Sequence, residues 1–278
     1  MPFPVFPSKI LTSNISSLIP LAQKLSKNGP VKRESTPRRI RGLFAGEWVF
    51  DTLGAVYVWE DVYYPYFYIP VNEFREGVLE KVEGKGEGED GFYLARLRVG
   101  DRSTERVIVF SSTSVEAVRG LVRVEHSTID WFAEDEKLLG PHPKDPYKRI
   151  ETLPSSRRVR IEVAGVVVAE SSQNVFLYET MLRPRYYLNA GDVKWEFLSE
   201  SGTISYCPYK GMATYYNVKV KGREIKDAVW YYRYPTSESA LVAGRLCFYN
   251  EKVDVFVDGV REESPRLFNI PFVQKGML

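Results

Sequence analysis

Short runs of β-branched and aromatic residues, separated by turn residues, recur along most of the chain. Ile40–Phe50 and Ala55–Trp59 are two such runs, and Asp51–Gly54 between them carries turn residues. Phe92–Val99 repeats the pattern after a charged, glycine-rich loop at Glu83–Gly91. Runs of this length and composition, bounded by turn residues, predict strands. The chain is therefore expected to be mainly β.

The second half of the chain shows the same pattern, and helices are expected at few places. Strands are predicted at Val159–Ala169, Val175–Glu179, Asp192–Ser199, Thr214–Val220, Asp227–Tyr232, Gly244–Tyr249 and Val253–Val257. Short helices are predicted at Asn14–Lys27 and Ser237–Val242. A third is predicted at Ser127–Leu139, because Ser127 and Asp130 resemble a capping box and Ile129, Phe132 and Glu136 follow helical spacing.

The chain also contains an internal repeat. A shift of 119 residues aligns Arg39–Phe74 with Arg158–Val193 without a gap. Identical pairs in this alignment are Arg39/Arg158, Arg41/Arg160, Ala45/Ala164, Gly46/Gly165, Val49/Val168, Val56/Val175, Glu60/Glu179, Pro65/Pro184 and Tyr68/Tyr187. Beyond small gaps, Gly120, Asp130 and Phe132 match Gly244, Asp254 and Phe256. A repeat of this length indicates two copies of one structural unit.

The repeat and the composition suggest five parts. Residues 1–37 would form an N-terminal arm with a short helix, residues 38–140 a first, divergent copy, and residues 141–156 a proline-rich connection. Residues 157–262 would form a second, complete copy, followed by a tail at 263–278.

The charge distribution argues against a nucleic-acid partner. Residues 1–33 hold five basic residues and no acid, and removing these five from the 38 basic residues leaves 33 against 36 acidic ones. Beyond this segment the chain is thus faintly acidic and lacks the electrostatic footprint expected of a nucleic-acid binder, with a local basic patch left open as the alternative. The acid-free N-terminal segment leaves a transit peptide open as an alternative to a simple arm.

Two cysteines do not make a disulfide framework, so a reduced, cytoplasmic setting is expected. No apolar run approaches the ~18 residues that a membrane helix needs, and no membrane association is expected. The aromatic content is high, with 18 Tyr, 15 Phe and 5 Trp. Aromatic residues suit strands and cores, but they also wall ligand cavities.

A glycine pattern in the first copy resembles a phosphate-binding loop but does not fit one. Gly86–Gly91 reads G-x-G-x-x-G, yet Glu87, Glu89 and Asp90 would repel a pyrophosphate. The segment that follows is a predicted strand and not the helix that the motif must open. We interpret it as a hairpin loop.

Several segments of the second copy together resemble one known family. They are Glu179, Pro184-Arg185-Tyr186-Tyr187, Asp192-Val193, Cys207-Pro208-Tyr209-Lys210-Gly211, Trp230 and Ala243-Gly244 to Phe248-Tyr249. The resemblance is to the DUF427 family, also labelled nucleotidyltransferase-like (NTP_transf_9), over Arg157–Arg261 and more weakly over Arg38–Asp135, as in members with tandem copies. It implies a mostly β domain with a twisted, Mss4-like arrangement of sheets, and it implies little about activity.

The first copy lacks the segment Cys207–Gly211, so at most one complete site of this kind is expected per chain. Lys210 is the first catalytic candidate, because Pro208 and Gly211 fix its direction and a lysine can act as a base, form a Schiff base or hold an anion. Glu179 is the second, paired with Lys210 or Arg185, and Tyr215 the third, as a hydrogen-bond donor. A structural role for Lys210 and Glu179 remains the alternative, since Glu60 repeats Glu179 in a copy without the lysine.

The remaining candidates would bind the substrate. They are Arg185, Tyr187, Cys207, Tyr209, Trp230 and Tyr232, and ordinary core packing is the alternative for the aromatic ones. A Cys–His dyad is not expected, because His126 lies in the first copy and His142 in the connection. The two cysteines and two histidines are not at zinc-ligand spacing, so no metal site and no cofactor are expected.

These residues favour chemistry that depends on shape and a few polar contacts. The leading hypothesis is a metal-independent enzyme that binds a small, largely apolar metabolite in an aromatic-lined pocket, such as a cyclase of the intramolecular cycloaddition type in secondary metabolism. The alternatives are a nucleotide-binding or nucleotidyltransferase-like protein and a non-catalytic binding or scaffold protein. A small-molecule ligand is the only partner expected, and the sequence does not indicate an oligomeric state.

Overall fold

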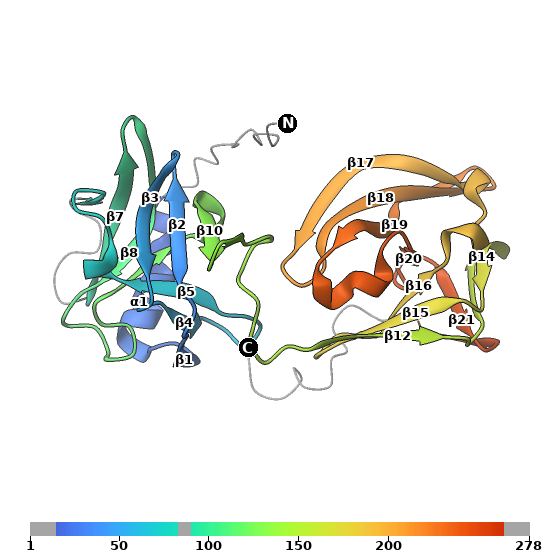
Figure 1. Cartoon of the computed structure of the whole chain (residues 1–278), viewed down its shortest axis with the longest axis horizontal. Coiled ribbons are helices and arrows are strands. Elements are labelled where there is room, and N and C mark those ends of the chain that lie inside the picture. Colours follow the sequence, from blue (N-terminus) through green and yellow to red (C-terminus); the bar gives the residue numbers. More distant parts are fainter. Residues whose placement is uncertain (1–14, 83–89, 264–278) are drawn as a thin grey trace. The chain divides into compact units, whose positions relative to one another are not determined.

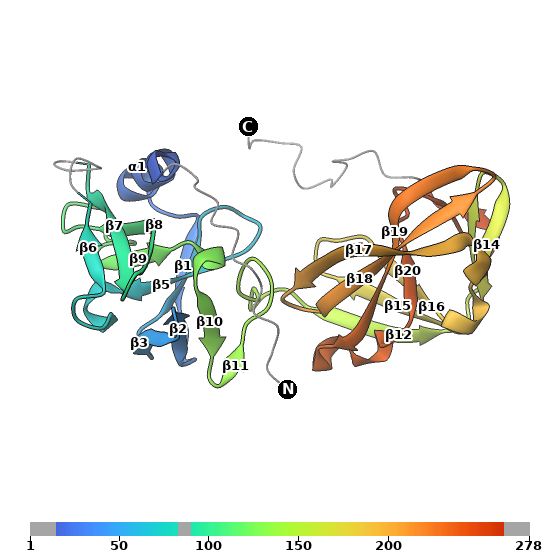
Figure 2. The same cartoon turned by 90° about the horizontal axis from the view of Figure 1, so that it is seen from above.

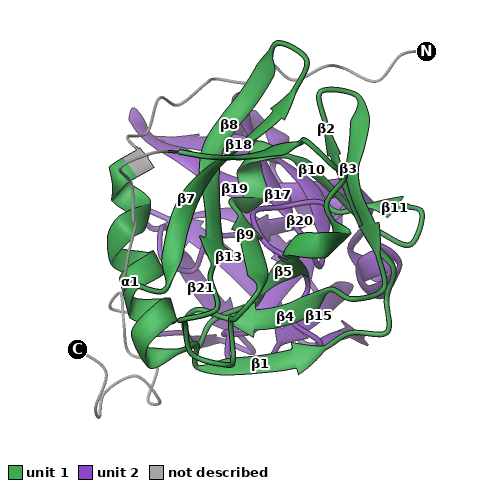
Figure 3. Cartoon of the chain, turned by 90° about the vertical axis from the view of Figure 1, so that its left-hand side faces the viewer, with its two compact units in different colours: residues 1–138 green, residues 139–278 purple. Residues whose placement is uncertain are grey.

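The chain folds into two compact units. The computed structural model describes residues 15–82 and 90–263, and contacts divide the chain into unit 1, Met1–Leu138, and unit 2, Leu139–Leu278. Figure 3 colours the two units separately. Each unit is described by itself below.

Unit 1 is built on a seven-stranded antiparallel sheet with the strand order β1-β4-β5-β9-β8-β7-β6. Its strands are β1 (Lys32–Ser35), β4 (Val56–Trp59), β5 (Tyr66–Pro70), β6 (Leu79–Lys81), β7 (Phe92–Val99), β8 (Arg102–Phe110) and β9 (Leu121–Val124) (Figure 1). A four-stranded antiparallel sheet, in the order β11-β10-β2-β3, contains β2 (Ile40–Phe44), β3 (Glu47–Thr52), β10 (Asp130–Ala133) and β11 (Glu136–Lys137). The helices are η1 (Ile15–Leu18), α1 (Ile19–Asn28), η2 (Val71–Glu73) and η3 (His126–Thr128).

Unit 2 repeats this plan strand for strand. Its seven-stranded sheet has the order β12-β15-β16-β20-β19-β18-β17, with β12 (Ile150–Ser155), β15 (Asn174–Glu179), β16 (Arg185–Leu188), β17 (Leu198–Cys207), β18 (Gly211–Val220), β19 (Arg223–Pro235) and β20 (Leu246–Phe248). The four-stranded sheet, in the order β14-β13-β21-β22, contains β13 (Val159–Val163), β14 (Val166–Ser171), β21 (Asp254–Val257) and β22 (Val260–Arg261). Short helices are η4 (Ala190–Asp192), η5 (Trp195–Phe197) and η6 (Ser237–Val242).

The prediction of a mainly β chain with two tandem copies and few short helices is therefore confirmed. The repeat extends to backbone detail at the first hairpin of each unit. Ala45 and Ala164 both have a positive φ, of 51° and 49°, and each is followed by a glycine that also has a positive φ. A two-residue turn with both φ angles positive matches the twist of the strands that it joins, although alanine adopts this conformation only at a cost.

The two sheets of each unit enclose a hydrophobic core, and the cores differ in a complementary way. In unit 1, Phe50 lies across from Gly42, and a Cβ atom on Gly42 would come within 2.3 Å of the Phe50 ring. In unit 2 the equivalent partners are Ile161 and Ala169. Unit 1 thus places the large side chain on β3, the second strand of the hairpin, whereas unit 2 places it on β13, the first strand. The volume that the two side chains fill together stays similar.

The outer face of the seven-stranded sheet is covered differently in the two units. In unit 1, helix α1 lies over this sheet, as Figure 2 shows from above, and Ala22 and Leu25 of α1, with Leu18 at the end of η1, pack onto this face. The face itself consists of Val56, Val58, Tyr68, Leu94, Ile108 and Phe110. In unit 2 the corresponding face carries Tyr187, Trp230, Tyr232 and Cys247, and Val242 of η6 packs against them. An aromatic cluster with η6 thus takes the place of a helix.

Two elements predicted from the sequence are wrong, and two strands lie in segments where none was predicted. Ser127–Leu139 is not a helix, because β10 pairs with β2, and Ile129 and Trp131 are buried while Asp130 between them is exposed. Asp192–Ser199 is not a continuous strand, since η4 ends at Asp192, η5 spans Trp195–Phe197 and β17 begins only at Leu198. β1 lies within the segment interpreted as an arm and β12 within the segment interpreted as a connection. The helix predicted at Asn14–Lys27 is confirmed as η1 and α1. Most of the loop Glu83–Gly91 lies outside the described residues.

Candidate functional site

The β17–β18 turn of unit 2 holds Pro208, Tyr209 and Lys210 and is fixed on several sides. The Tyr209 hydroxyl accepts a hydrogen bond of 2.6 Å from the backbone N–H of Asp145. The Tyr209 carbonyl accepts hydrogen bonds from the hydroxyls of Thr236 and Ser239, next to and within η6. Burial raises the pKa of the Tyr209 phenol. The turn is thus part of the folded core of unit 2, and its lysine has a defined direction.

Lys210 points from this turn to Glu179 at the end of β15. Its Nζ atom lies 2.5 Å from Oε2 of Glu179, and the side chains are 14% and 7% exposed. A buried carboxylate is tolerated only when it is paired, so this contact neutralises both groups. Of the two cations considered as partners of Glu179, Lys210 makes the ion pair. Arg185 instead binds Glu251, at 3.0 Å from each Nη atom, and lies over the rings of Trp230 and Tyr249.

Unit 1 makes a related ion pair, but its cation is an arginine and comes from a strand. Glu60, the counterpart of Glu179, accepts hydrogen bonds from Arg123 of β9, at 2.6 and 3.3 Å, and one from the Tyr68 hydroxyl at 3.1 Å. Arg123 lies opposite Tyr68 in the sheet. The residue opposite Tyr187, the counterpart of Tyr68, is Cys247. Unit 2 therefore lacks the arginine in its sheet and supplies a lysine from the turn.

The aromatic candidates of unit 2 form one packed cluster. Tyr187, Trp230 and Tyr232 are buried together with Cys247, and Trp230 donates a 3.1 Å hydrogen bond to the Tyr187 hydroxyl. Burial raises the pKa of the phenols of Tyr187 and Tyr232 well above the ordinary value. These phenols stay protonated and can only act as hydrogen-bond partners. Their mutual packing gives no firm indication of a ligand pocket.

Tyr215 and Cys207 lie at the edge of this cluster and are half-buried. The Tyr215 hydroxyl is 2.6 Å from the Ser205 hydroxyl on the neighbouring strand. Cys207 is a free thiol, and so is the fully buried Cys247. Burial raises the pKa of the Cys247 thiol, against the opposing effect of Arg185 and Lys210. Cys247 therefore stays a neutral thiol.

His142 is a residue of this region that the sequence did not place here. Its ring lies 6.4 Å from the ring of Tyr209. Burial lowers the pKa of His142, against the opposing effect of Asp145 and Glu179, so the ring is neutral near pH 7. Nδ1 donates to the carbonyl of Pro143 at 2.7 Å, which leaves the lone pair of the neutral ring on Nε2. Nothing in the spacing of the sequence signals that residues 139–149 fold back onto the turn.

A hollow of about 260 Å³ lies elsewhere in unit 2, on its four-stranded sheet. Its walls are formed by Arg158, Arg160, Glu170, Phe256, Asp258 and Gly259. None of the site residues predicted from the sequence lines it.

Within residues 15–82 and 90–263, no three His, Cys, Asp or Glu side chains come together as a metal site. In the same part of the chain, none of the helices is long and apolar enough to cross a membrane.

Comparison with known proteins agrees with the fold. None of the curated proteins matches the chain significantly. One family model matches it twice, over residues 32–135 and 151–259, once in each unit. Because these two segments cover most of the chain, the protein belongs to the family described as domain of unknown function DUF427 (NTP_transf_9), with two tandem copies of the domain.

Proposed function

We propose that unit 2 is a metal-independent enzyme of the cyclase type for a small, largely apolar metabolite, and that a polar group of this ligand contacts Lys210 and Glu179. The observation that carries the proposal is the exchange of cations between the units. Glu60 is held by an arginine within its sheet, whereas Glu179 is held by a lysine on a turn.

The exchange matters because the two cations differ chemically. Arginine stays protonated in proteins, so the cation of unit 1 can neither act as a base nor form a Schiff base. Lysine can give up its proton or form a Schiff base, and its ammonium can hold a carboxylate or a carbonyl oxygen. The neutral ring of His142 near Glu179 adds a group that can accept a proton.

The surroundings suit a reaction that depends on orientation. Tyr187, Trp230 and Tyr232 present rings and protonated phenols on the sheet face that helix α1 covers in unit 1. Tyr215 can donate a hydrogen bond to a carbonyl. Holding a flexible substrate in a reactive conformation and polarising one carbonyl are the two contributions that a cyclisation needs most.

A nucleotidyltransferase-like function receives less support from the geometry. Such a protein needs several cations for its phosphates, but Arg185 is bound to Glu251 through both Nη atoms, and Lys210 alone has to balance Glu179 as well. A non-catalytic scaffold is favoured by one observation, the close mutual packing of the aromatic cluster. Both remain alternatives that the following experiment separates.

The first test is a thermal-shift panel. Stabilisation by apolar carboxylic acids or polyenes, but not by nucleotides with magnesium, supports the proposal, and the reverse result contradicts it. No response to either class favours a scaffold. The matched variant is Lys210→Arg, which keeps the positive charge but cannot be deprotonated. Arg123→Lys in unit 1 is the control, and we expect it to leave every ligand response unchanged.

A further inference from the structure

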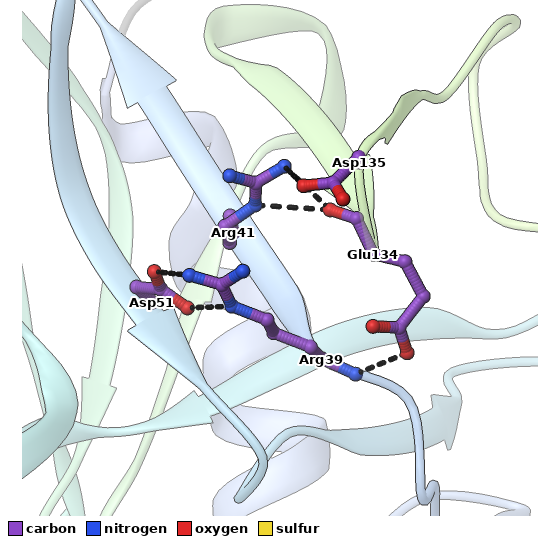
Figure 4. Close-up of polar contacts among 5 residues, drawn as sticks. All are labelled: Arg39, Arg41, Asp51, Glu134 and Asp135. Atoms are coloured by element: carbon purple, nitrogen blue, oxygen red, sulfur yellow. Dashed lines mark hydrogen bonds and ion pairs between the residues drawn. The ribbon is translucent and has the colours of Figure 1, made fainter.

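Unit 1 contains a complete arginine site on its four-stranded sheet (Figure 4). The Arg41 guanidinium lies over the rings of Trp48 and Phe132, with its central carbon 4.5 and 5.6 Å from the ring centres. It donates to the carbonyl of Glu134, at 3.0 and 2.6 Å, and to the carboxylate of Asp135 at 2.8 Å. Two rings, a carbonyl and a carboxylate thus surround a side chain that is only 12% exposed.

A second arginine lies beside this site, and unit 2 reproduces its contacts. In unit 1, Arg39 binds the Asp51 carboxylate, and its backbone N–H donates to the Glu134 side chain at 2.9 Å. In unit 2 the equivalent arginine, Arg158, binds Glu170 at 2.6 Å. Its backbone N–H donates to Asp258 at 3.0 Å, and Asp258 also binds Arg157. The charges of Arg39 in unit 1, and of Arg157 and Arg158 in unit 2, are therefore paired within their own unit.

The central arginine of unit 2 has lost most of its partners. Arg160, the counterpart of Arg41, still lies over an aromatic ring, that of Phe256, at 4.4 Å. Gly259 stands where unit 1 has Asp135, and Val167 stands where unit 1 has Trp48. Among the described residues, the buried Nε atom of Arg160 makes no hydrogen bond, although an oxygen of Glu162 lies 3.0 Å from it. The hollow of about 260 Å³ opens beside it.

We propose that this hollow binds a small aromatic carboxylate. The ligand would supply the two groups that unit 1 provides from its own chain, the carboxylate of Asp135 and the ring of Trp48. A guanidinium favours both partners, since it binds carboxylates through paired N–H groups and stacks on flat rings. The hollow is slightly smaller than typical ligand pockets, which suits a ligand with one ring.

One group competes with such a ligand. Glu162, two residues along β13, has an oxygen 3.0 Å from Nε of Arg160, where unit 1 has the uncharged Leu43. This ion pair engages the Nε–H group of the guanidinium. A ligand carboxylate could still accept hydrogen bonds from the two Nη atoms. The competition predicts that removing the Glu162 charge tightens ligand binding.

The test is an NMR titration of the ¹⁵N-labelled full chain with benzoate. Benzamide, which has the same shape without the charge, and acetate, which has the charge without the ring, are the comparison probes. We expect benzoate to shift the Gly259 amide and the Arg160 Nε–H signals, and both comparison probes to bind at least ~10-fold more weakly. Equal binding of benzoate and benzamide would overturn the proposal, and so would a benzoate titration that leaves the Gly259 amide unmoved.

Two variants at Gly259 provide a matched pair. Gly259 has a φ of 82°, which aspartate and asparagine tolerate better than other residues. Gly259→Asp adds a negative charge to the wall of the hollow and should abolish benzoate binding, whereas Gly259→Asn adds a side chain of the same size without the charge and should retain it. Equal binding by both variants would refute the comparison with unit 1.

Variants of the charged groups complete the test. Arg160→Gln should abolish binding, and Glu162→Gln should strengthen it. Wild-type affinity in Arg160→Gln, or weaker binding in Glu162→Gln, would count against the site. Lys210→Arg should leave benzoate binding at this hollow unchanged, so failure here does not depend on the proposed function.

Discussion

Replacing Arg123 with methionine tests whether the cation of unit 1 is structural. The side chains of Arg123 and Glu60 are 8% and 9% exposed, and removing one partner leaves the other charge buried and unpaired. Breaking a buried pair of this kind costs about 3–5 kcal/mol. The Tyr68 hydroxyl, which donates to Glu60, compensates only a part of this loss, because one neutral donor replaces an arginine with two hydrogen bonds. We therefore expect the free energy of unfolding of unit 1 to fall by an amount in this range.

Hydrogen exchange as a function of urea measures this loss, because peptides from β4 and β9 report the opening of unit 1 separately from unit 2. The control is the triple variant Glu60→Met, Tyr68→Phe, Arg123→Met, which removes every polar group of the network together. It should lie within about 1 kcal/mol of the wild type, since apolar replacement of a buried ion pair is often neutral. A loss below about 1 kcal/mol in the single variant, or an equal loss in the triple variant, would refute this reasoning.

Three further predictions concern other residues. Lys210→Arg should change the stability of unit 2 by about 1 kcal/mol or less in a thermal melt, because the ion pair with Glu179 is kept. Turnover of a ligand found in the panel should be lost in a product assay, because arginine can neither give up its proton nor form a Schiff base. His142 has a lowered pKa in the folded state, so stability should be lost as the pH falls below ~6.5, and His142→Gln should flatten this dependence in urea midpoints measured at several pH values. Gly42→Ala should destabilise unit 1 by about 1–3 kcal/mol in a urea titration, because its Cβ atom would meet the Phe50 ring, and the pair Gly42→Ile with Phe50→Ala should recover most of the loss.

The sequence predicted the architecture because the repeat preserves exposed hairpin turns and buried strand positions. The exception, Ser127–Leu139, is instructive. Asp130 and Phe132 aligned with Asp254 and Phe256, which lie in a correctly predicted strand, so the repeat already contradicted the helix. Local capping and spacing signals favoured a helix, but backbone pairing with β2 decided the outcome.

The candidate site was less accessible to sequence reasoning. The ion pair of Lys210 with Glu179 was among the pairings considered, since a lysine fixed by a turn and a glutamate at a strand end suggested it. The approach of His142 could not be foreseen, because a long-range fold of residues 139–149 produces it. The loss of Arg123 in unit 2 could have been found by extending the repeat alignment from Gly120 and Gly244, which aligns Cys247 with Arg123.

The exchange of large and small residues between Gly42–Phe50 and Ile161–Ala169 also bears on how the chain avoids misfolding. Tandem domains of similar sequence risk pairing a strand of one with a strand of the other. If β2 of unit 1 paired with β14 of unit 2, Gly42 would face Ala169 and leave a void. If β13 paired with β3, Ile161 would collide with Phe50. Each strand therefore packs well only with the partner strand of its own unit. The divergence of the two cores thus disfavours the exchange of strands between the units.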